Sequence, residues 1–383
     1  MAGQSIAVVA AVEAGGTSFK VAVCTVLLDE SGNVSSSSFQ PPEIIHRTEV
    51  DSSHDDPGRT LDECCAFFLE HKPKDGYSAL GLATFGPVGV RPDRTKEYGR
   101  ILKSSPKASW RDVDLLGPLK KTCQGATPMA VKVETDVNAP ALAEYLKVSA
   151  ERTITSVAYI TVGTGVGVGL IVNDKTVHGR MHPEGGHVPI HPLPNDTFSG
   201  YSWGDRSPFR GQNTVEGVAC SVALTERLDQ ITGKKSLSRS VLADLPDDHE
   251  IWDHAANALA SLCTTLLLTL SIELIVLGGG IVQRRGLLDK IRSRTVECLN
   301  GYLELPADMS TLIKMASFGK DSGLVGATIL AHDAMLDDDK CTRAREKKMK
   351  QEAFGYGLRH GFLVGVLSAA LIFRYGLMGR RAR

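Results

Sequence analysis

Apolar runs flank glycine-rich turns at two places in the chain. Residues 6–12 and 19–28 are apolar or β-prone, and they enclose the sequence Glu13-Ala-Gly-Gly-Thr17. This pattern is typical of a β-hairpin whose turn exposes backbone N–H groups. A second hairpin is predicted over 157–172, with Gly163-Thr-Gly165 as its turn. Because only the hairpin pattern recurs, we interpret the pair as a weak internal repeat.

Shorter apolar runs and helical periodicity predict the remaining elements. Strands are expected at 78–84, 129–133 and 274–277, and helices at 60–70, 216–231, 254–270 and 323–334. Stretches rich in polar residues, proline or glycine predict a surface excursion at 29–57, a loop region on the side of the active site at 91–118 and a long loop at 173–215.

The composition changes after Leu336. Residues 337–358 begin with a charged and polar run that suits a solvated linker, and 359–383 are mostly apolar but interrupted by Arg374. A membrane span needs about 20 apolar residues, although an arginine near one end can reach the headgroups. Two interpretations stay open for 359–383: an anchor that tethers the protein to an organelle membrane, and an amphipathic or packing helix.

Composition and charge argue against several classes of protein. The 383 residues allow two domains, and the net charge of −1 argues against a nucleic-acid binder. Eight cysteines without a CxxC pair are too sparse for a disulfide scaffold, which favours a reducing, cytoplasmic location. The first residues lack the basic region of a signal peptide, and Glu13 interrupts their apolar run.

Three glycine turns suggest a site for phosphates. Gly15 and Gly16 let the backbone approach a ligand closely, and Thr17 adds a hydroxyl donor. The turn Gly163-Thr164-Gly165 repeats this donor arrangement, and Gly278-Gly279-Gly280 follows a buried strand. Glu13 precedes the first turn and could hold Mg²⁺ through water. Neither a GxxxxGK[ST] nor a GxGxxG sequence occurs.

Asp136 follows a predicted strand and allows two interpretations. Its carboxylate could accept a hydroxyl proton while the oxygen attacks a phosphoryl group. The local sequence alone favours the other interpretation, since an aspartate at the start of a helix is a natural N-cap.

The segment His182-Pro-Glu-Gly-Gly-His187 is a third candidate site. Glu184 and His187 are suited to binding a polyol, but four histidines in fourteen residues (178, 182, 187 and 191) also allow a metal site or a surface cluster. Since no cysteine lies between Cys123 and Cys220, a thiolate-rich zinc site is excluded in this loop.

Seven motifs in this order resemble those of the ROK family of sugar kinases, most of all the ROK fructokinases. They cover residues 5–335 and are Glu13-Ala-Gly-Gly-Thr17, Phe85-Gly-Pro-Val88, Ser105-Pro-Lys-x-x-Trp110, Glu134-Thr-Asp-Val-Asn138, Thr161-Val-Gly-Thr-Gly-Val-Gly-Val-Gly169, His182-Pro-Glu-Gly-Gly-His187 and Leu277-Gly-Gly-Gly280. The resemblance implies an α/β fold of the actin-like ATPase type, with two ribonuclease-H-like domains around a cleft. We expect the domains at 1–135 and 136–336, with the last helix able to pack back on the first.

The resemblance also implies roles for the residues of these motifs. ATP phosphates would contact the turn that ends at Thr17 and the turn around Thr164, while the triple-glycine turn would line the adenosine. Asp136 would be the general base. The sugar would be bound by Thr135, Asn138, Glu184 and His187.

The implied activity is ATP-dependent phosphorylation of a hexose at its 6-hydroxyl, most of all D-fructose, with Mg²⁺. The alternatives are a glucose, mannose or N-acetylhexosamine kinase and a non-catalytic sugar-sensing scaffold. Relatives are often homodimers. Family fructokinases commonly bind a structural zinc, but Ser202-Trp-Gly-Asp205 stands where Cys-x-x-His is expected, and Gly185 replaces the usual methionine. We therefore expect no zinc, with the loop 189–215 held by packing.

Overall fold

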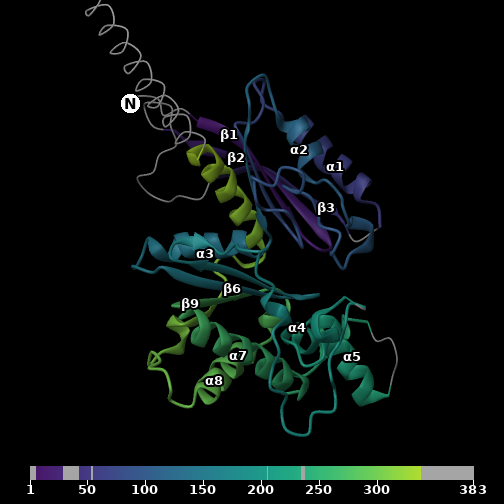
Figure 1. Ribbon diagram of the computed structural model, residues 1–383, viewed down its shortest axis with the longest axis vertical. Helices are drawn as coiled ribbons and strands as arrows, with labels where there is room; N and C mark the ends of the chain where they lie inside the picture. The colour runs from purple at the N-terminus through teal and green to yellow at the C-terminus, as the bar shows by residue number, and fades with distance from the viewer. Residues whose placement is uncertain (1–5, 29–42, 53–54, 205, 234–237, 338–383) are drawn as a thin grey trace, which may run out of the picture. The chain divides into compact units, whose positions relative to one another are not determined.

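Two five-stranded sheets form the framework of the protein. The computed structural model describes residues 6–28, 43–52, 55–204, 206–233 and 238–337 (Figure 1). All statements below concern this part of the chain.

The first sheet has the strand order β3-β2-β1-β4-β5. The β1–β2 hairpin and the β2–β3 pair are antiparallel, whereas β4 and β5 run parallel to β1. The strands are β1 (Ile6–Ala14), β2 (Ser18–Leu27), β3 (Glu43–Asp51), β4 (Ala79–Thr84) and β5 (Ala130–Thr135).

The second sheet repeats this topology strand for strand. Its order is β8-β7-β6-β9-β10, with β6–β7 and β7–β8 antiparallel and with β9 and β10 parallel to β6. The strands are β6 (Ser156–Val162), β7 (Val166–Val172), β8 (Lys175–Thr176), β9 (Leu274–Gly278) and β10 (Ile313–Met315). The internal repeat predicted from the two hairpins is therefore correct, and it extends to the whole sheet.

Helices cover the first sheet on both faces. α1 (Pro57–Glu70) and α2 (Leu116–Cys123) pack on one face through an apolar core that includes Phe68 and Leu119. A helix over 322–337 packs on the other face. Gly81 of β4 lies directly against the backbone of Ala327, and this close approach leaves no room for a Cβ.

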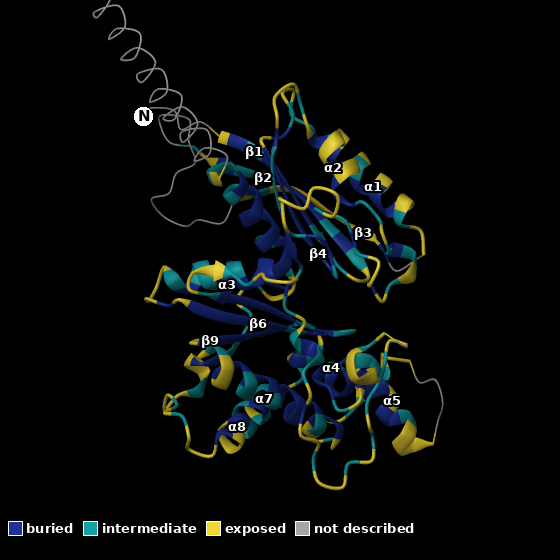
Figure 2. Cartoon of the chain, viewed as in Figure 1, coloured by how far each residue is buried: buried dark blue, intermediate teal, exposed yellow. Residues whose placement is uncertain are grey.

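Helices also cover both faces of the second sheet (Figure 1). α3 (Asn138–Ser149) packs on one face, and a larger core on the other includes residues of α4, α5, α7 and α8. The strands β6, β7 and β9 are mostly buried, whereas β8 and the outer sides of the helices are more exposed (Figure 2). The helices are α4 (Val215–Ala219), α5 (Ser221–Thr232), α6 (Val241–Asp244), α7 (Ile251–Leu270) and α8 (Leu287–Leu299).

Several elements differ from those predicted. The stretch 29–57, predicted as a loop, contains the edge strand β3, whose mostly exposed side chains gave no buried face to detect. The helix predicted over 216–231 is two helices, because Cys220 adopts an extended backbone between α4 and α5. The helices α2 and α8 and the strand β10 were not predicted.

The C-terminal predictions fall outside the described residues. This applies to the charged linker from residue 338 and to the apolar segment 359–383. Within the described part of the chain, no helix has the length and the apolar character that a membrane crossing requires. The domain boundary near residue 135 stays a prediction.

Candidate active site

The β1–β2 turn presents the first predicted phosphate loop. Gly15 N–H donates to Ser18 O at 3.0 Å, and Gly16 and Thr17 are exposed. Ser52 holds the turn from the side, since its N–H donates to Thr17 O at 3.0 Å. The turn is therefore fixed by its own backbone and keeps its tip open to a ligand.

The β6–β7 turn presents the second loop. Gly163 N–H donates to Gly165 O at 2.9 Å, and Ser221 N–H at the start of α5 donates to Gly163 O at 2.8 Å. Thr164 lies at the tip, and its Oγ1 accepts a hydrogen bond from Arg239 at 3.1 Å. Sequence analysis missed Arg239, which belongs to none of the motifs.

The glycine turn after β9 is shaped by close packing. Gly278 lies against the hydroxyl of Tyr159, and Gly279 has a φ of +91° that favours glycine. Around Gly280 no heavy atom of the described residues would meet a side chain. The turn is thus tightly packed at Gly278 and Gly279 and has open space at Gly280.

Asp136 lies where the parallel strands β4 and β5 end. Its N–H donates to Thr84 O at 2.8 Å, which fixes the backbone at the sheet edge. Burial, followed by the negative charge of Glu13, raises the pKa of Asp136 to about 7, although its own backbone N–H and Lys107 act in the opposite direction. A carboxyl with this pKa can exchange a proton near neutral pH.

The N-cap interpretation of Asp136 is wrong. Val137 occupies the N-cap position of α3 without a side-chain cap, and Thr135 Oγ1 accepts the hydrogen bond from Asn138 N–H at 3.0 Å. Because Thr135 satisfies this N–H, the Asp136 carboxylate is not needed by the helix.

Thr135 and Asn138 are both buried and already paired. Asn138 Oδ1 accepts from Leu170 N–H at 2.9 Å, and its Nδ2 donates to Glu134 Oε2 at 3.0 Å. Glu134, itself buried, also contacts His178 Nε2. Contact of Thr135 and Asn138 with a sugar stays a prediction, and the bonds observed here instead orient the segment that carries Asp136.

Glu184 and His187 come together with a residue that sequence analysis missed. His187 Nε2 lies 3.9 Å from Glu184 Oε2, and its Nδ1 lies 3.9 Å from Glu216 Oε1. Burial and the charges of Glu216 and Asp136 raise the pKa of Glu184 above its ordinary value. Glu216 also accepts a hydrogen bond from Val166 N–H at 2.9 Å, which links this group to the β6–β7 turn, the second predicted phosphate loop.

Glu13 is bound on both sides of its carboxylate. Oε2 accepts a hydrogen bond from Lys20 at 2.9 Å, and the carboxylate also accepts one from Leu324 N–H. Gly323 lies so close to Oε1 that a side chain would not fit there. Burial nevertheless raises the pKa of Glu13 above its ordinary value. These contacts tie β1 to the start of the last helix, and the magnesium role of Glu13 stays a prediction.

Lys107 contacts the β1–β2 turn, the first predicted phosphate loop, and acts electrostatically on Asp136. Its ammonium donates to Gly16 O, lies 4.7 Å from the ring centre of Phe85, and lowers the pKa of Asp136. Burial lowers the pKa of Lys107 itself. Sequence analysis gave Lys107 no role. Its place in the motif Ser105-Pro-Lys107 was the signal that could have marked it as a site residue.

The histidines of the segment 178–191 contact different parts of the protein. His182 is buried, and its Nε2 accepts a hydrogen bond from Val88 N–H at 3.3 Å. Burial lowers the pKa of His182, in keeping with a neutral acceptor. In the described part of the chain, no three or more His, Cys, Asp or Glu side chains are grouped to hold a metal ion.

A buried ionic cluster fixes the loop that follows. Arg227 forms two hydrogen bonds to the carboxylate of Asp196, at 2.7 and 2.8 Å, and each side chain is only 4% exposed. His254 Nδ1 lies 3.0 Å from the same carboxylate. Arg227 also lies over the ring of Phe198 at 4.6 Å. This cluster, rather than apolar packing alone, holds part of the loop 189–215.

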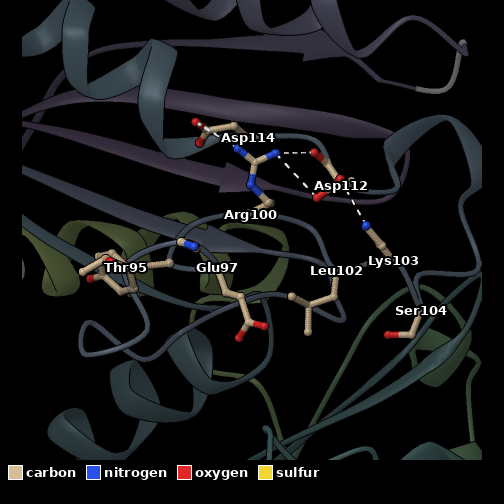
Figure 3. A pocket seen from close by; sticks show the side chains of 10 residues that line it. Thr95, Glu97, Arg100, Leu102, Lys103, Ser104, Asp112 and Asp114 are labelled. Atoms are coloured by element: carbon tan, nitrogen blue, oxygen red, sulfur yellow. Dashed lines mark hydrogen bonds and ion pairs between the residues drawn. The ribbon is translucent and has the colours of Figure 1, made fainter.

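A cavity of about 820 Å³ lies along the segment 95–114 (Figure 3). None of the predicted site residues lines it. It is lined by three basic residues (Lys96, Arg100 and Lys103) and three acidic ones (Glu97, Asp112 and Asp114). Arg100 lies 3.6 Å from Asp112 and 3.6 Å from Asp114. Because these charges balance and pair with one another, this cavity is not suited to a phosphate.

Known proteins resemble most of the chain. The model of the ROK family matches residues 9–334. A fructokinase from Pediococcus pentosaceus is 32% identical over 325 residues, which are 85% of this chain and 98% of that protein. A fructokinase from Zymomonas mobilis is 35% identical over 279 residues, or 72% and 85% of the two chains.

A solved structure supports the fold. A ROK family glucokinase from Streptomyces griseus, in complex with glucose and AMPPNP, aligns with a TM-score of 0.59 at 23% identity, covering 85% of this chain and 99% of that one. The match confirms the predicted α/β fold of the actin-like ATPase type.

Proposed function

The chain belongs to the ROK family, and we propose that it transfers the γ-phosphoryl group of ATP to the 6-hydroxyl of a hexose, with D-fructose as its substrate. It is a sugar kinase by this membership, and the two fructokinase relatives support the choice of sugar. The observation that carries the reaction is Asp136, a carboxyl at the ends of two parallel strands with a pKa of about 7.

Asp136 acts as the general base in this proposal. It takes the proton from the sugar hydroxyl as the oxygen attacks the γ-phosphorus, and the bond to the β-phosphate oxygen breaks to release ADP. Its raised pKa makes it a stronger base than an exposed aspartate, while it is still largely ionised slightly above neutral pH.

The two hairpin turns bind the phosphates. The backbone N–H groups around Gly16 and Thr17 on one side, and around Thr164 on the other, meet the charge that develops on the transferred group. The turn at Gly278–Gly280 would receive the adenosine. Backbone hydrogen bonds within each turn fix its shape, so little rearrangement is needed to form these contacts.

Glu184, His187 and Glu216 bind the sugar. The carboxylates of Glu184 and Glu216 lie on either nitrogen of the His187 imidazole. They offer acceptors to neighbouring hydroxyls of the sugar, and the imidazole adds a donor. This group selects a polyol over an apolar alcohol, because an analogue without hydroxyls would leave these polar groups unpaired.

Magnesium would neutralise phosphate charge when it is bound with ATP. The described residues do not offer it a site of their own, because the Glu13 carboxylate is occupied by Lys20 and Leu324 N–H. We therefore assign the ion to the nucleotide and derive no step through it.

The test is a coupled assay of ATP consumption with fructose, glucose, mannose and N-acetylmannosamine. Fructose should give the highest kcat/KM. Asp136→Asn should lower kcat by about 10²–10⁴-fold and leave ATP affinity within a few-fold. Preference for another hexose would establish the alternative sugar kinases, and no turnover with any hexose would favour the non-catalytic sugar-sensing scaffold.

Assembly and location are separate proposals. Homodimer formation can be read from the mass in solution. Attachment through 359–383 can be tested by fractionating the full chain against a chain that ends at residue 340. Equal distribution of the two would exclude the anchor.

A further inference from the structure

A second cavity lies beside the phosphate loop at Thr164. Its volume is about 410 Å³, and its lining includes Ser221, Arg239, Trp252 and Gly280. Ser221 is the residue whose N–H holds Gly163 O, so the cavity adjoins the base of that loop. Gly280 places the cavity at the turn where we propose the adenosine to bind.

The charge of this cavity differs from that in Figure 3. The described residues that line it include three arginines (239, 284 and 285) and no carboxylate. Arg284 is committed to the protein, because it pairs with Asp247 at 3.0 Å and donates to Leu245 O at 2.9 Å. The remaining positive charge favours an anionic ligand.

Arg239 reaches from this cavity to the tip of the loop. Its Nη1 donates to Thr164 Oγ1 at 3.1 Å, although the two residues are 75 positions apart in the sequence. The side chain is exposed, and the hydroxyl that it contacts is neutral. A hydrogen bond from a guanidinium to a phosphate is stronger than one to a hydroxyl, and the planar group can bind two phosphate oxygens at once.

We propose that Arg239 binds the phosphate chain of the nucleotide and determines the preference of this site for a triphosphate over a nucleoside. The inference rests on the proposed function, to which it adds a residue outside all seven motifs. When ATP binds, the guanidinium exchanges the Thr164 hydroxyl for phosphate oxygens. The base and ribose occupy the cavity between Gly280 and the segment that carries Arg239.

Titration calorimetry of the full chain with ATP, ADP, AMP and adenosine tests this role. We expect Arg239→Gln to weaken ATP binding about tenfold, as the loss of a charge-assisted hydrogen bond implies, and adenosine binding less than twofold. Arg239→Lys keeps the charge but not the planar group, so its ATP affinity should lie between those of the wild type and Arg239→Gln. The KM for fructose should stay within twofold in both variants.

Arg152→Gln is the matched control. Arg152 is an exposed arginine that also donates to a neutral oxygen, Thr311 O at 3.3 Å, but it precedes β6 whereas Thr164 follows that strand. Its variant should bind ATP as the wild type does. Equal losses for ATP and adenosine in Arg239→Gln, or ATP binding within twofold of the wild type, would overturn the inference. A wild-type chain that binds no ATP would overturn the proposed function as well.

Discussion

Thr135 Oγ1 accepts the hydrogen bond from Asn138 N–H at 3.0 Å, and this bond leaves the intervening Asp136 free of helix α3. Thr135→Val keeps the shape of the side chain and removes the acceptor. We expect the variant to lose about 1 kcal/mol of stability. The Asn138 N–H then loses its acceptor and the segment that carries Asp136 is less firmly oriented, so kcat should fall more than either KM rises. Urea unfolding and steady-state kinetics measure the two effects.

The control for this variant is Asp56→Ala. Asp56 caps α1 by accepting from Arg59 N–H at 3.1 Å. Its loss should lower stability in the same way and leave kcat unchanged. A Thr135→Val enzyme with wild-type kcat would contradict the role given to this bond.

The activity should depend on pH through Asp136. Because the base acts when it is deprotonated and its pKa is raised to about 7, kcat/KM should fall tenfold per pH unit well below that value and level off above it. The measurement is kcat/KM for fructose in overlapping buffers from about pH 5 to pH 9. A flat profile across neutral pH would argue against Asp136 as the titrating base.

Lys107 should set the position of that profile. Its positive charge lowers the pKa of Asp136, so Lys107→Met should move the midpoint to higher pH as well as lower the rate. Lys103→Met removes an ammonium whose side chain is 84% exposed and lies 3.9 Å from Asp112. This second variant should leave the midpoint in place. The interpretation fails if both profiles coincide with that of the wild type.

Glu13 should contribute to stability through its contact with Lys20. Glu13→Ala removes the acceptor of the 2.9 Å hydrogen bond from Lys20 and of the bond from Leu324 N–H, in mostly buried surroundings, and about 2 kcal/mol of the free energy of unfolding should be lost. The Mg²⁺ concentration for half-maximal activity should stay within twofold. A tenfold rise in that concentration would instead support the magnesium role predicted from the sequence.

Asp196 should be needed for the stability of the loop 189–215. Asp196→Asn leaves Arg227 buried without its full charge partner, which typically costs about 3 kcal/mol. Burial acts to raise the pKa of Asp196, but the hydrogen bonds from Arg227 and Phe198 N–H hold it below its usual value. The stabilisation is therefore present at neutral pH and is lost as the pH falls through this low pKa.

The control is Asp289→Asn, which removes a surface pair with Arg292 at 3.1 Å, Asp289 being 78% exposed. It should change the unfolding free energy little. A small effect of Asp196→Asn, comparable to this control, would show that apolar packing holds the loop.

The sequence was sufficient for the elements whose pattern is local. The two hairpins, their glycine turns and Asp136 at a strand end follow from apolar runs and turn residues, and the motif order identified the family. The edge strand β3 was missed because most of its side chains are exposed, so that its hydrogen bonds to β2 determine it.

Residues brought together by the fold lay beyond this reasoning. Glu216 reaches His187 and Arg239 reaches Thr164 only after distant segments have packed, so nothing near them in the sequence marks them. Asp136 shows the same limit, since local sequence favoured an N-cap. In the structure the Thr135 hydroxyl, and not the Asp136 carboxylate, accepts from the helix N–H of Asn138. The direction of this hydroxyl depends on the backbone at the end of β5.

The contact between Gly81 and Ala327 has a consequence for how the protein is made. One face of the first sheet stays uncovered until the helix over 322–337 has been synthesised, although all five strands leave the ribosome long before it. The first sheet therefore cannot be covered on both faces during most of translation. A chain that ends near residue 320 would lack this helix and would leave one face of the first sheet exposed.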